Sequence, residues 1–276
     1  MLLLAAAPCW AQNRVLTIKG SDTMVILGQR WAEEYMKTHK DTVIQITGGG
    51  SGTGIAALIN GSADIAQCSR PMKEDEKQAV EKKRGKKVEE IPVALDGLAI
   101  YVHQSNPISE ISLTQAKAIY TGDATNWSAL GVNAGPIIAH SRENNSGTYM
   151  YFKEHVLGNE DFAPEVLHLP GTAAVINAVS KDKKAIGYGG IAYAKGIKAI
   201  KVRKDADSPA VEPTMVNVVT GKYPISRYLY FYIPGKPEGS AKAFIEWVLS
   251  AQGQKVCEKV GYYPLPKARK GSNKKV

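Results

Sequence analysis

Short apolar runs alternate with amphipathic segments in the first part of the chain. The runs that predict strands are residues 15–18, 43–46 and 64–66. After the first run, Met24, Leu27, Trp31 and Tyr35 recur at helical spacing, which predicts an amphipathic helix. Further helices are expected from residue 55 and over residues 73–84. Strand, loop and helix in alternation predict an α/β fold with a mainly parallel sheet and crossover helices.

The pattern changes from residue 91 onward. Apolar runs at residues 91–95 and 98–102 flank Asp96-Gly97, where we expect the chain to cross into a second lobe. A capping box at Ser112 and Gln115 predicts a helix there. Further strands are expected at residues 136–140 and 185–188, a return crossing at 223–233, and one last amphipathic helix around Trp247. The expected division is residues 12–95 with 221–276 for one lobe and 96–220 for the other.

Three loops rich in glycine, serine and threonine carry the candidate chemistry: residues 20–23, 48–54 and 141–148. Each follows a predicted strand and opens a predicted helix. A helix N-terminus offers unpaired N–H groups and a partial positive charge, and glycine lets a ligand approach the backbone. Parallel sheets place their ligands at the carboxyl ends of the strands. The three loops therefore predict one anion site, shared between two lobes.

Two arginines are candidate cations for this site. Arg142 lies four residues before Ser146, and its planar fork can donate two parallel bonds to an oxyanion. Arg70 follows the third predicted strand and is the second candidate. Taken singly, either arginine has a plain structural interpretation, as a salt-bridge or surface residue. The prediction depends on three loops of one type at one sheet edge.

The N-terminus and the cysteines bear on location. Residues 1–11 resemble the apolar core and exit of a secretory signal peptide without its charged start. Lipid anchoring at Cys9 is not expected, because Pro8 stands where a small residue is needed. Cys68 and Cys257 could form one disulfide or remain two buried thiols. We expect a secreted protein, periplasmic or extracellular.

The formal net charge of +9 comes partly from residues 82–87 and a basic C-terminal tail. These basic runs lack interleaved aromatic residues, so we expect no nucleic-acid partner. No His/Cys cluster has zinc spacing, and no P-loop occurs. A nucleophile elbow beginning at Gly49 fails because Thr53 replaces its last glycine. We therefore expect neither an enzyme nor a metal or other cofactor.

The chain resembles the phosphate-binding subunits of bacterial ABC importers, a family of periplasmic binding proteins. The resemblance covers nearly the whole mature chain. Its motifs are residues 19–23, the GGGSGTG loop, residues 63–70, Arg142-x-x-x-Ser146-Gly147-Thr148, residues 224–227 and residues 261–265. It implies a two-lobed periplasmic-binding-protein fold of type II, with the ligand in the interlobe cleft. It also implies a monomer that binds inorganic phosphate with high affinity, closes by a hinge and delivers its ligand to a membrane permease.

The resemblance also implies the ligand-binding residues. Matched by position, they are Ser21, Thr23, Ser51, Gly52, Arg142, Ser146, Gly147 and Thr148. Asp22, Ser69 and Arg70 join them as candidates from the loops and strand ends of this sequence. Well-known members place an aspartate, which accepts a proton from phosphate, at the position of Arg70. Our hypothesis is that Asp22 takes this role. Two alternatives stay open: another oxyanion such as tungstate, molybdate or sulfate, or a secreted phosphatase or hydrolase that uses Ser51 or Ser146.

Overall fold

The computed structural model describes residues 15–133 and 135–266. The expected signal peptide, Cys9 and the basic tail from Lys267 onward lie outside these residues. The strands are β1 (Val15–Gly20), β2 (Val43–Thr47), β3 (Ile65–Cys68), β4 (Val88–Val102), β5 (Glu110–Ser112), β6 (Ile138–Arg142), β7 (Leu167–Leu169), β8 (Ala185–Gly190), β9 (Lys198–Arg203) and β10 (Ser226–Pro234). The helices are α1 (Asp22–Met36), α2 (Ser51–Asn60), α3 (Glu74–Arg84), α4 (Leu113–Thr121), α5 (Gly147–His155), α6 (Gly171–Lys181), α7 (Met215–Val219), α8 (Gly239–Leu249) and α9 (Ala251–Val260), with short 3₁₀ turns at Trp127–Leu130 and Ile191–Tyr193.

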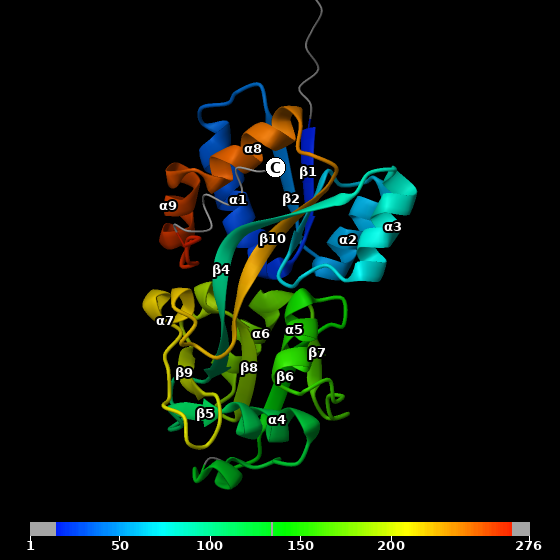
Figure 1. The fold of residues 1–276 in the computed structure, drawn as a ribbon. Helices are drawn as coiled ribbons and strands as arrows, with labels where there is room; N and C mark the ends of the chain where they lie inside the picture. Colours follow the sequence, from blue (N-terminus) through cyan, green and yellow to red (C-terminus); the bar gives the residue numbers. More distant parts are fainter. Residues whose placement is uncertain (1–14, 134, 267–276) are drawn as a thin grey trace, which may run out of the picture.

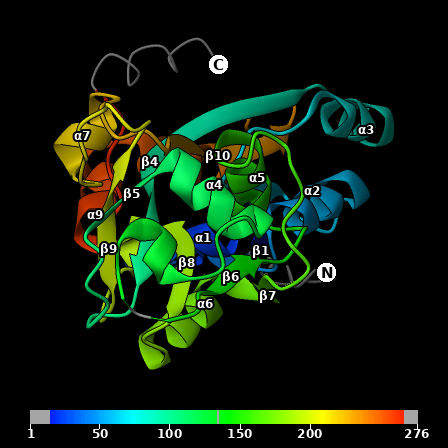
Figure 2. The ribbon, with the colours of Figure 1, turned by 90° about the horizontal axis from the view of Figure 1, so that it is seen from below.

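The elements form two lobes, one above the other in Figure 1. We call the part built from β1–β3, β10, α1–α3, α8, α9 and the start of β4 the first lobe. The part built from β5–β9, α4–α7 and the end of β4 is the second lobe. Figure 1 shows α2 and α3 on one side of the first lobe and α1, α8 and α9 on the other. Figure 2 shows α4 and α5 on one face of the β6–β8 strands and α6 on the opposite face.

One path of paired strands runs through both lobes, in the order β2-β1-β3-β10-β4-β8-β6-β7. The pairs β1–β2, β1–β3, β6–β7 and β6–β8 are parallel, as the alternation of strands and helices predicts. The pairs that involve β10 or β4 are antiparallel. The sheet is therefore mixed, with parallel outer strands and antiparallel strands where the chain crosses between lobes.

β4 and β10 are the two crossing strands. The predicted runs 91–95 and 98–102 form one continuous strand of 15 residues. It pairs with β10 up to Gly97, and from Leu98 onward with β8. Pro92 cannot donate to the ladder, and the register shifts opposite it, between Leu229 and Tyr230. The lobe boundaries predicted at residues 95/96 and 220/221 stay a prediction, which this change of partner supports.

Each lobe has its own apolar core. In the first lobe, Trp31, Phe231 and Phe244 are fully buried, and Trp31 meets Phe231 edge-on. In the second lobe, Phe152 and Tyr188 stack with their ring centroids 3.8 Å apart. Separate cores allow each lobe to stay rigid while the connection between them bends.

The C-terminal segment differs from the prediction of one helix. Ser250 ends α8 and caps α9, because its Oγ accepts a hydrogen bond from the N–H of Gly253. A Cβ atom on Gly253 would lie 2.4 Å from the carbonyl oxygen of Trp247, so the tight corner requires glycine. Cys68 and Cys257 are both buried and are not joined to each other in a disulfide, which agrees with the two-thiol alternative.

Candidate anion-binding site

Hydroxyl side chains from the loops of both lobes meet where the lobes touch. We call Ser21, Thr23, Ser51, Ser69 and Thr148 the hydroxyl cluster; all five are buried. The Oγ of Ser21 donates to Ser69 Oγ at 2.9 Å, and Ser69 Oγ lies 3.5 Å from Thr148 Oγ1. The N–H of Ser69 donates to Ser51 Oγ at 3.1 Å. The predicted meeting of the loops at one sheet edge therefore exists in the structure.

The two lobes are in direct contact at this cluster. Thr23 Oγ1 of the first lobe lies 2.8 Å from Thr148 Oγ1 of the second. The N–H of Gly52 donates to the carbonyl of Asn145 at 2.9 Å, and the Asn145 amide donates to the carbonyl of Gly49 at 3.0 Å. Gly50 has φ +92°, and a Cβ atom there would lie 2.7 Å from the Asn145 carbonyl oxygen. Glycine is thus required for this approach, and the lobes are closed on each other.

Three helices point their N-termini at the cluster. α1 begins at Asp22, α2 at Ser51 and α5 at Gly147, so the partial positive charges of three helix ends converge. Ser146 caps α5, since its Oγ accepts from the N–H groups of Thr148 and Tyr149. Ser146 therefore fixes the end of α5. This concentration of N–H groups and hydroxyls suits an anion.

Arg142 lies at the end of β6 and is 1% exposed. Its Nη2 donates to Asp22 Oδ2 at 2.7 Å across the interlobe contact, and its Nη1 donates to Thr172 Oγ1 at 2.8 Å. Burial lowers the pKa of Arg142, and the Asp22 carboxylate opposes this effect. Nε of Arg142 is buried and has no hydrogen-bond partner among the described residues. One donor of this guanidinium is thus available to a ligand.

Asp22 holds Arg142 in place. Its Oδ2 accepts from Arg142, and its Oδ1 accepts from the N–H of Gly49 at 2.8 Å. Both oxygens are engaged, so these contacts give Asp22 a positioning role. The hypothesis that Asp22 accepts a ligand proton gains no support from them.

Arg70 lies outside the hydroxyl cluster. Its two terminal nitrogens donate to the two carboxylate oxygens of Glu76 at 2.8 and 2.7 Å, and one also donates to the carbonyl of Pro71. Glu76 is the third residue of α3 and also accepts from the N–H of Lys73. The guanidinium therefore braces the start of α3, in contrast to the expected ligand contact.

Arg227 and Asp96 were not among the predicted site residues, although they belong to the cluster's surroundings. Asp96 is fully buried on β4, and its Oδ2 accepts from Nε and Nη2 of Arg227 on β10. Nη2 of Arg227 also donates to Thr148 Oγ1 at 3.0 Å. Burial raises the pKa of Asp96, and the charge of Arg227 opposes this. The two residues are 131 positions apart, so no local pattern indicates their pairing.

Comparison with known proteins identifies the family. The model of a PBP superfamily domain matches residues 8–252. The phosphate-binding protein PstS of Pseudomonas aeruginosa PAO1 is 40% identical over 268 residues, which cover 91% of this chain and 83% of that protein. The chain belongs to the PstS family within the PBP superfamily. PstS of Staphylococcus epidermidis RP62A is 33% identical over 90% of this chain and 78% of that protein.

A solved structure agrees with this assignment of the PstS family. It is a putative phosphate ABC transporter substrate-binding protein from Clostridium perfringens, with bound phosphate. The identity is 32%, the TM-score is 0.83, and the alignment covers 92% of this chain and all of that one. The predicted family, the phosphate-binding subunits of bacterial ABC importers, and the predicted α/β fold of periplasmic binding proteins are confirmed.

The contacts of Ser51 and Ser146 bear on the hydrolase alternative. Ser51 Oγ accepts from a backbone N–H, and Ser146 Oγ accepts from two. Within residues 15–133 and 135–266, neither hydroxyl is hydrogen-bonded to a histidine or a carboxylate that could act as its base. The same residues hold no group of three His, Cys, Asp or Glu side chains suited to a metal ion.

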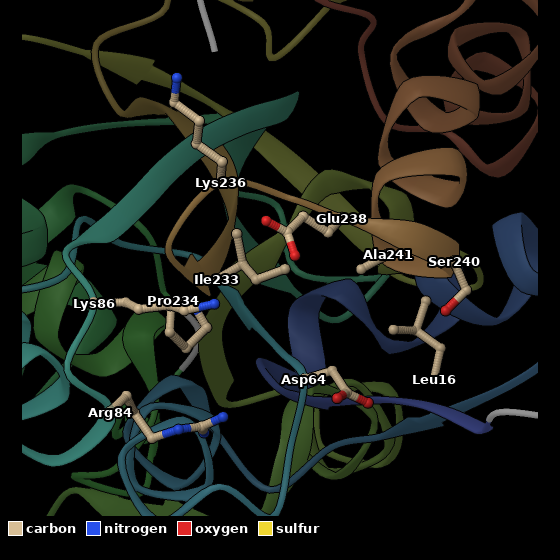
Figure 3. Close-up of a pocket in the computed structure, with 10 residues that line it drawn as sticks. All are labelled: Leu16, Asp64, Arg84, Lys86, Ile233, Pro234, Lys236, Glu238, Ser240 and Ala241. Carbon is tan, nitrogen blue, oxygen red and sulfur yellow. The ribbon is translucent and has the colours of Figure 1, made fainter.

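Of two pockets in the structure, one adjoins the surroundings of the cluster and the other does not. A pocket of about 440 Å³ is lined by Arg70, Tyr151, Tyr228 and Arg227, among others, and therefore borders the cluster through Arg227. A second pocket, of about 200 Å³, is shown in Figure 3. It is lined by residues of both charges, including Asp64, Lys86 and Lys236, and by no residue of the hydroxyl cluster.

None of the described helices has the length and apolar character to span a membrane.

Proposed function

We propose that this chain binds inorganic phosphate with high affinity between its lobes and delivers it to an ABC importer. The contact that carries the proposal is the interlobe one: buried hydroxyls and three helix N-termini meet beside Arg142, whose Nε is free to donate. Relatives at 33–40% identity are named phosphate-binding protein PstS, which supports phosphate over tungstate, molybdate or sulfate.

The proposed ligand-binding residues follow the same geometry. Thr23, Ser51 and Thr148 supply hydroxyls, and Gly147 supplies a backbone N–H at the start of α5. Gly52 contributes to closure instead, because its N–H donates to the carbonyl of Asn145. Arg142 supplies the cation and is positioned by Asp22. Ser146 positions the start of α5. Ser21 and Ser69 extend the hydroxyl network. Arg70 has no direct role in this arrangement, because Glu76 holds its terminal nitrogens.

The remaining parts of the proposal concern context. The chain acts as a non-enzymatic, monomeric solute-binding protein outside the cytoplasm, and its partner is a permease in the membrane. The names of its relatives support a binding role. The hinge consists of β4 and β10, so the closed lobes present a combined surface to the permease.

Calorimetric titration of phosphate-stripped protein with phosphate, sulfate and molybdate tests the proposal. We expect tight binding of phosphate and much weaker binding of the other two anions. Thr148→Val keeps the shape but removes one buried hydroxyl; we expect phosphate affinity to fall about tenfold or more, from about 1.5 kcal/mol per bond to a charged group. Thr121→Val is the matched control, because the Thr121 hydroxyl bonds to Lys117 and Asp123 on α4 and its end.

Two results would contradict the proposal. The first is that none of the three anions binds to the stripped protein. The second is turnover of a phosphate ester that Ser51→Ala or Ser146→Ala abolishes, which would favour the hydrolase instead.

A further inference from the structure

The side chain of Arg227 extends from the crossing strand β10 to the hydroxyl cluster, where it contacts Thr148. It is the second residue of β10 and pairs in register with Asp96 of β4. Figure 1 shows β4 and β10 running between the lobes. It is only 4% exposed. A buried guanidinium is costly unless its charge and its donors are satisfied, so its contacts reveal its use.

Two of the three nitrogens of Arg227 have partners. Nε and Nη2 donate to Asp96 Oδ2 at 3.1 and 2.9 Å, and Nη2 also donates to Thr148 Oγ1 at 3.0 Å. The central carbon of the guanidinium lies 5.2 Å from the centroid of the Tyr151 ring, within the range of a cation–π contact. These contacts fix the plane of the guanidinium against α5.

The third nitrogen of Arg227 has none. Nη1 is buried and has no hydrogen-bond partner among the described residues. Nε of Arg70 and Nε of Arg142 show the same feature among the described residues, but Arg70 lies outside the cluster, where Glu76 holds its terminal nitrogens. Buried polar groups are nearly always paired, and an exception calls for a specific explanation. An oxyanion bound at the cluster would accept hydrogen bonds from Nη1 of Arg227 and Nε of Arg142.

We infer that Arg227 is a second guanidinium of the anion site, which donates to a bound tetrahedral oxyanion through Nη1 and is positioned by Asp96. The inference deepens the proposed function and rests on it. Thr148 links Arg227 to the hydroxyl cluster, because its hydroxyl contacts both Thr23 of the first lobe and Arg227 of the crossing strand. Arg227 also lines the pocket of about 440 Å³.

The charges around the cluster are balanced in pairs. Asp22 pairs with Arg142, and Asp96 pairs with Arg227. Each carboxylate occupies part of a guanidinium and leaves at least one N–H for the ligand. Asp22 and Arg142 come from different lobes and pair in the closed form, whereas Asp96 and Arg227 lie in register on the paired strands β4 and β10. Arg227 is therefore held in one orientation before the anion arrives, which reduces the entropy lost on binding.

The alternative is that Arg227 only ties β10 to β4 through Asp96. A purely structural pair would affect the stability of the protein and leave the affinity of the folded protein unchanged. The two roles are therefore separated by measuring both quantities on the same variants.

The test uses phosphate-stripped protein and inorganic phosphate, with affinity from calorimetry and ligand-free Tm from thermal unfolding. Arg227→Lys keeps the charge but cannot hold Asp96 and a ligand together; we expect phosphate affinity to fall at least 30-fold. Asp96→Asn keeps the shape and loosens the guanidinium, and we expect a fall of about fivefold or more. Arg203→Lys is the control for the exchange, since Arg203 pairs with Glu110 on β9 and β5; its affinity should stay within twofold.

Affinities of Arg227→Lys and Asp96→Asn within threefold of wild type, with a lower Tm alone, would overturn the inference and leave the phosphate proposal intact. If Arg227→Lys does not fold, Asp96→Asn decides the question by the same criterion. Failure of the wild-type protein to bind phosphate would instead remove the proposed function itself.

Discussion

Gly147 offers a steric test of the closed interlobe contact. It is the first residue of α5, in the second lobe, and its φ lies outside the positive range, so alanine fits its backbone. A Cβ atom there would lie 2.3 Å from Ser51 Oγ and 2.8 Å from Ser69 Oγ, both in the first lobe. Hydrogen bonds hold both oxygens: Ser51 Oγ accepts from the N–H of Ser69, and Ser69 Oγ accepts from Ser21 Oγ. Turning Ser51 aside would still leave its Cβ only 3.0 Å from the new Cβ. Ordinary van der Waals contact begins at 3.4 Å, so Gly147→Ala should separate the lobes locally by up to roughly 1 Å.

The cost of that separation follows from the interlobe hydrogen bonds. The bond from Gly52 to Asn145 is 2.9 Å long and would stretch to about 3.9 Å, beyond hydrogen-bonding range. The contact between Thr23 and Thr148, at 2.8 Å, would be lost in the same way. Two or three such bonds at about 1 kcal/mol each amount to ~2–3 kcal/mol against closure. Phosphate affinity should therefore fall about 30- to 150-fold.

Calorimetry with phosphate measures this loss, and small-angle scattering with and without phosphate measures closure. The backbone N–H of residue 147 is retained, so the loss reports on shape alone. Gly131→Ala is the control: a Cβ atom on Gly131 would meet no heavy atom within 4 Å, so the change should leave affinity unchanged despite its positive φ. An affinity of Gly147→Ala within threefold of wild type would refute the reasoning from interlobe contact.

Two further predictions concern titratable groups. Burial lowers the pKa of His140, so below about pH 6.5 the unfolded chain takes up a proton that the folded chain resists. The free energy of unfolding should therefore fall on acidification. Urea titrations at about pH 8 and 5.5 should show a smaller fall for His140→Gln than for the wild type, and an identical fall would contradict this prediction. Burial raises the pKa of Cys68 to about 12, so a maleimide should modify Cys68 in denaturant but not in the folded protein. Peptide mass mapping of the labelled protein measures this. Rapid labelling of Cys68 in the native protein would contradict its burial.

Local patterns are sufficient to predict the loops of the site. Each loop follows a strand and opens a helix, and parallel strands bring such loops to one edge whatever the distant sequence does. The loops that contain Thr23, Ser51 and Thr148 are therefore predictable from local pattern, and the resemblance to the family selects these residues within them. The structure joins all three in one cluster.

The arginines show where local reasoning ends. Arg70 and Arg227 both lie beside strands that reach the site, but their partners decide their roles. Glu76 stands only six residues after Arg70, yet its ability to hold the guanidinium depends on where α3 begins. The pairing of Arg227 with Asp96 depends on the register of β10 against β4, including a shift near Pro92, and no local pattern specifies it.

The place of β10 in the sheet also determines the order in which the protein can fold. β10 lies between β3 and β4, so these two strands have no partner on that side until the chain beyond Ser226 has been made. The elements β5–β9 and α4–α7 of the second lobe lie between the two crossings and are made earlier in synthesis. A nascent chain that stops before β10 would expose the edges of β3 and β4, which invite pairing with other chains. The last strand to be synthesised thus closes the first lobe, and a truncation before it should aggregate instead of yielding a stable half-protein.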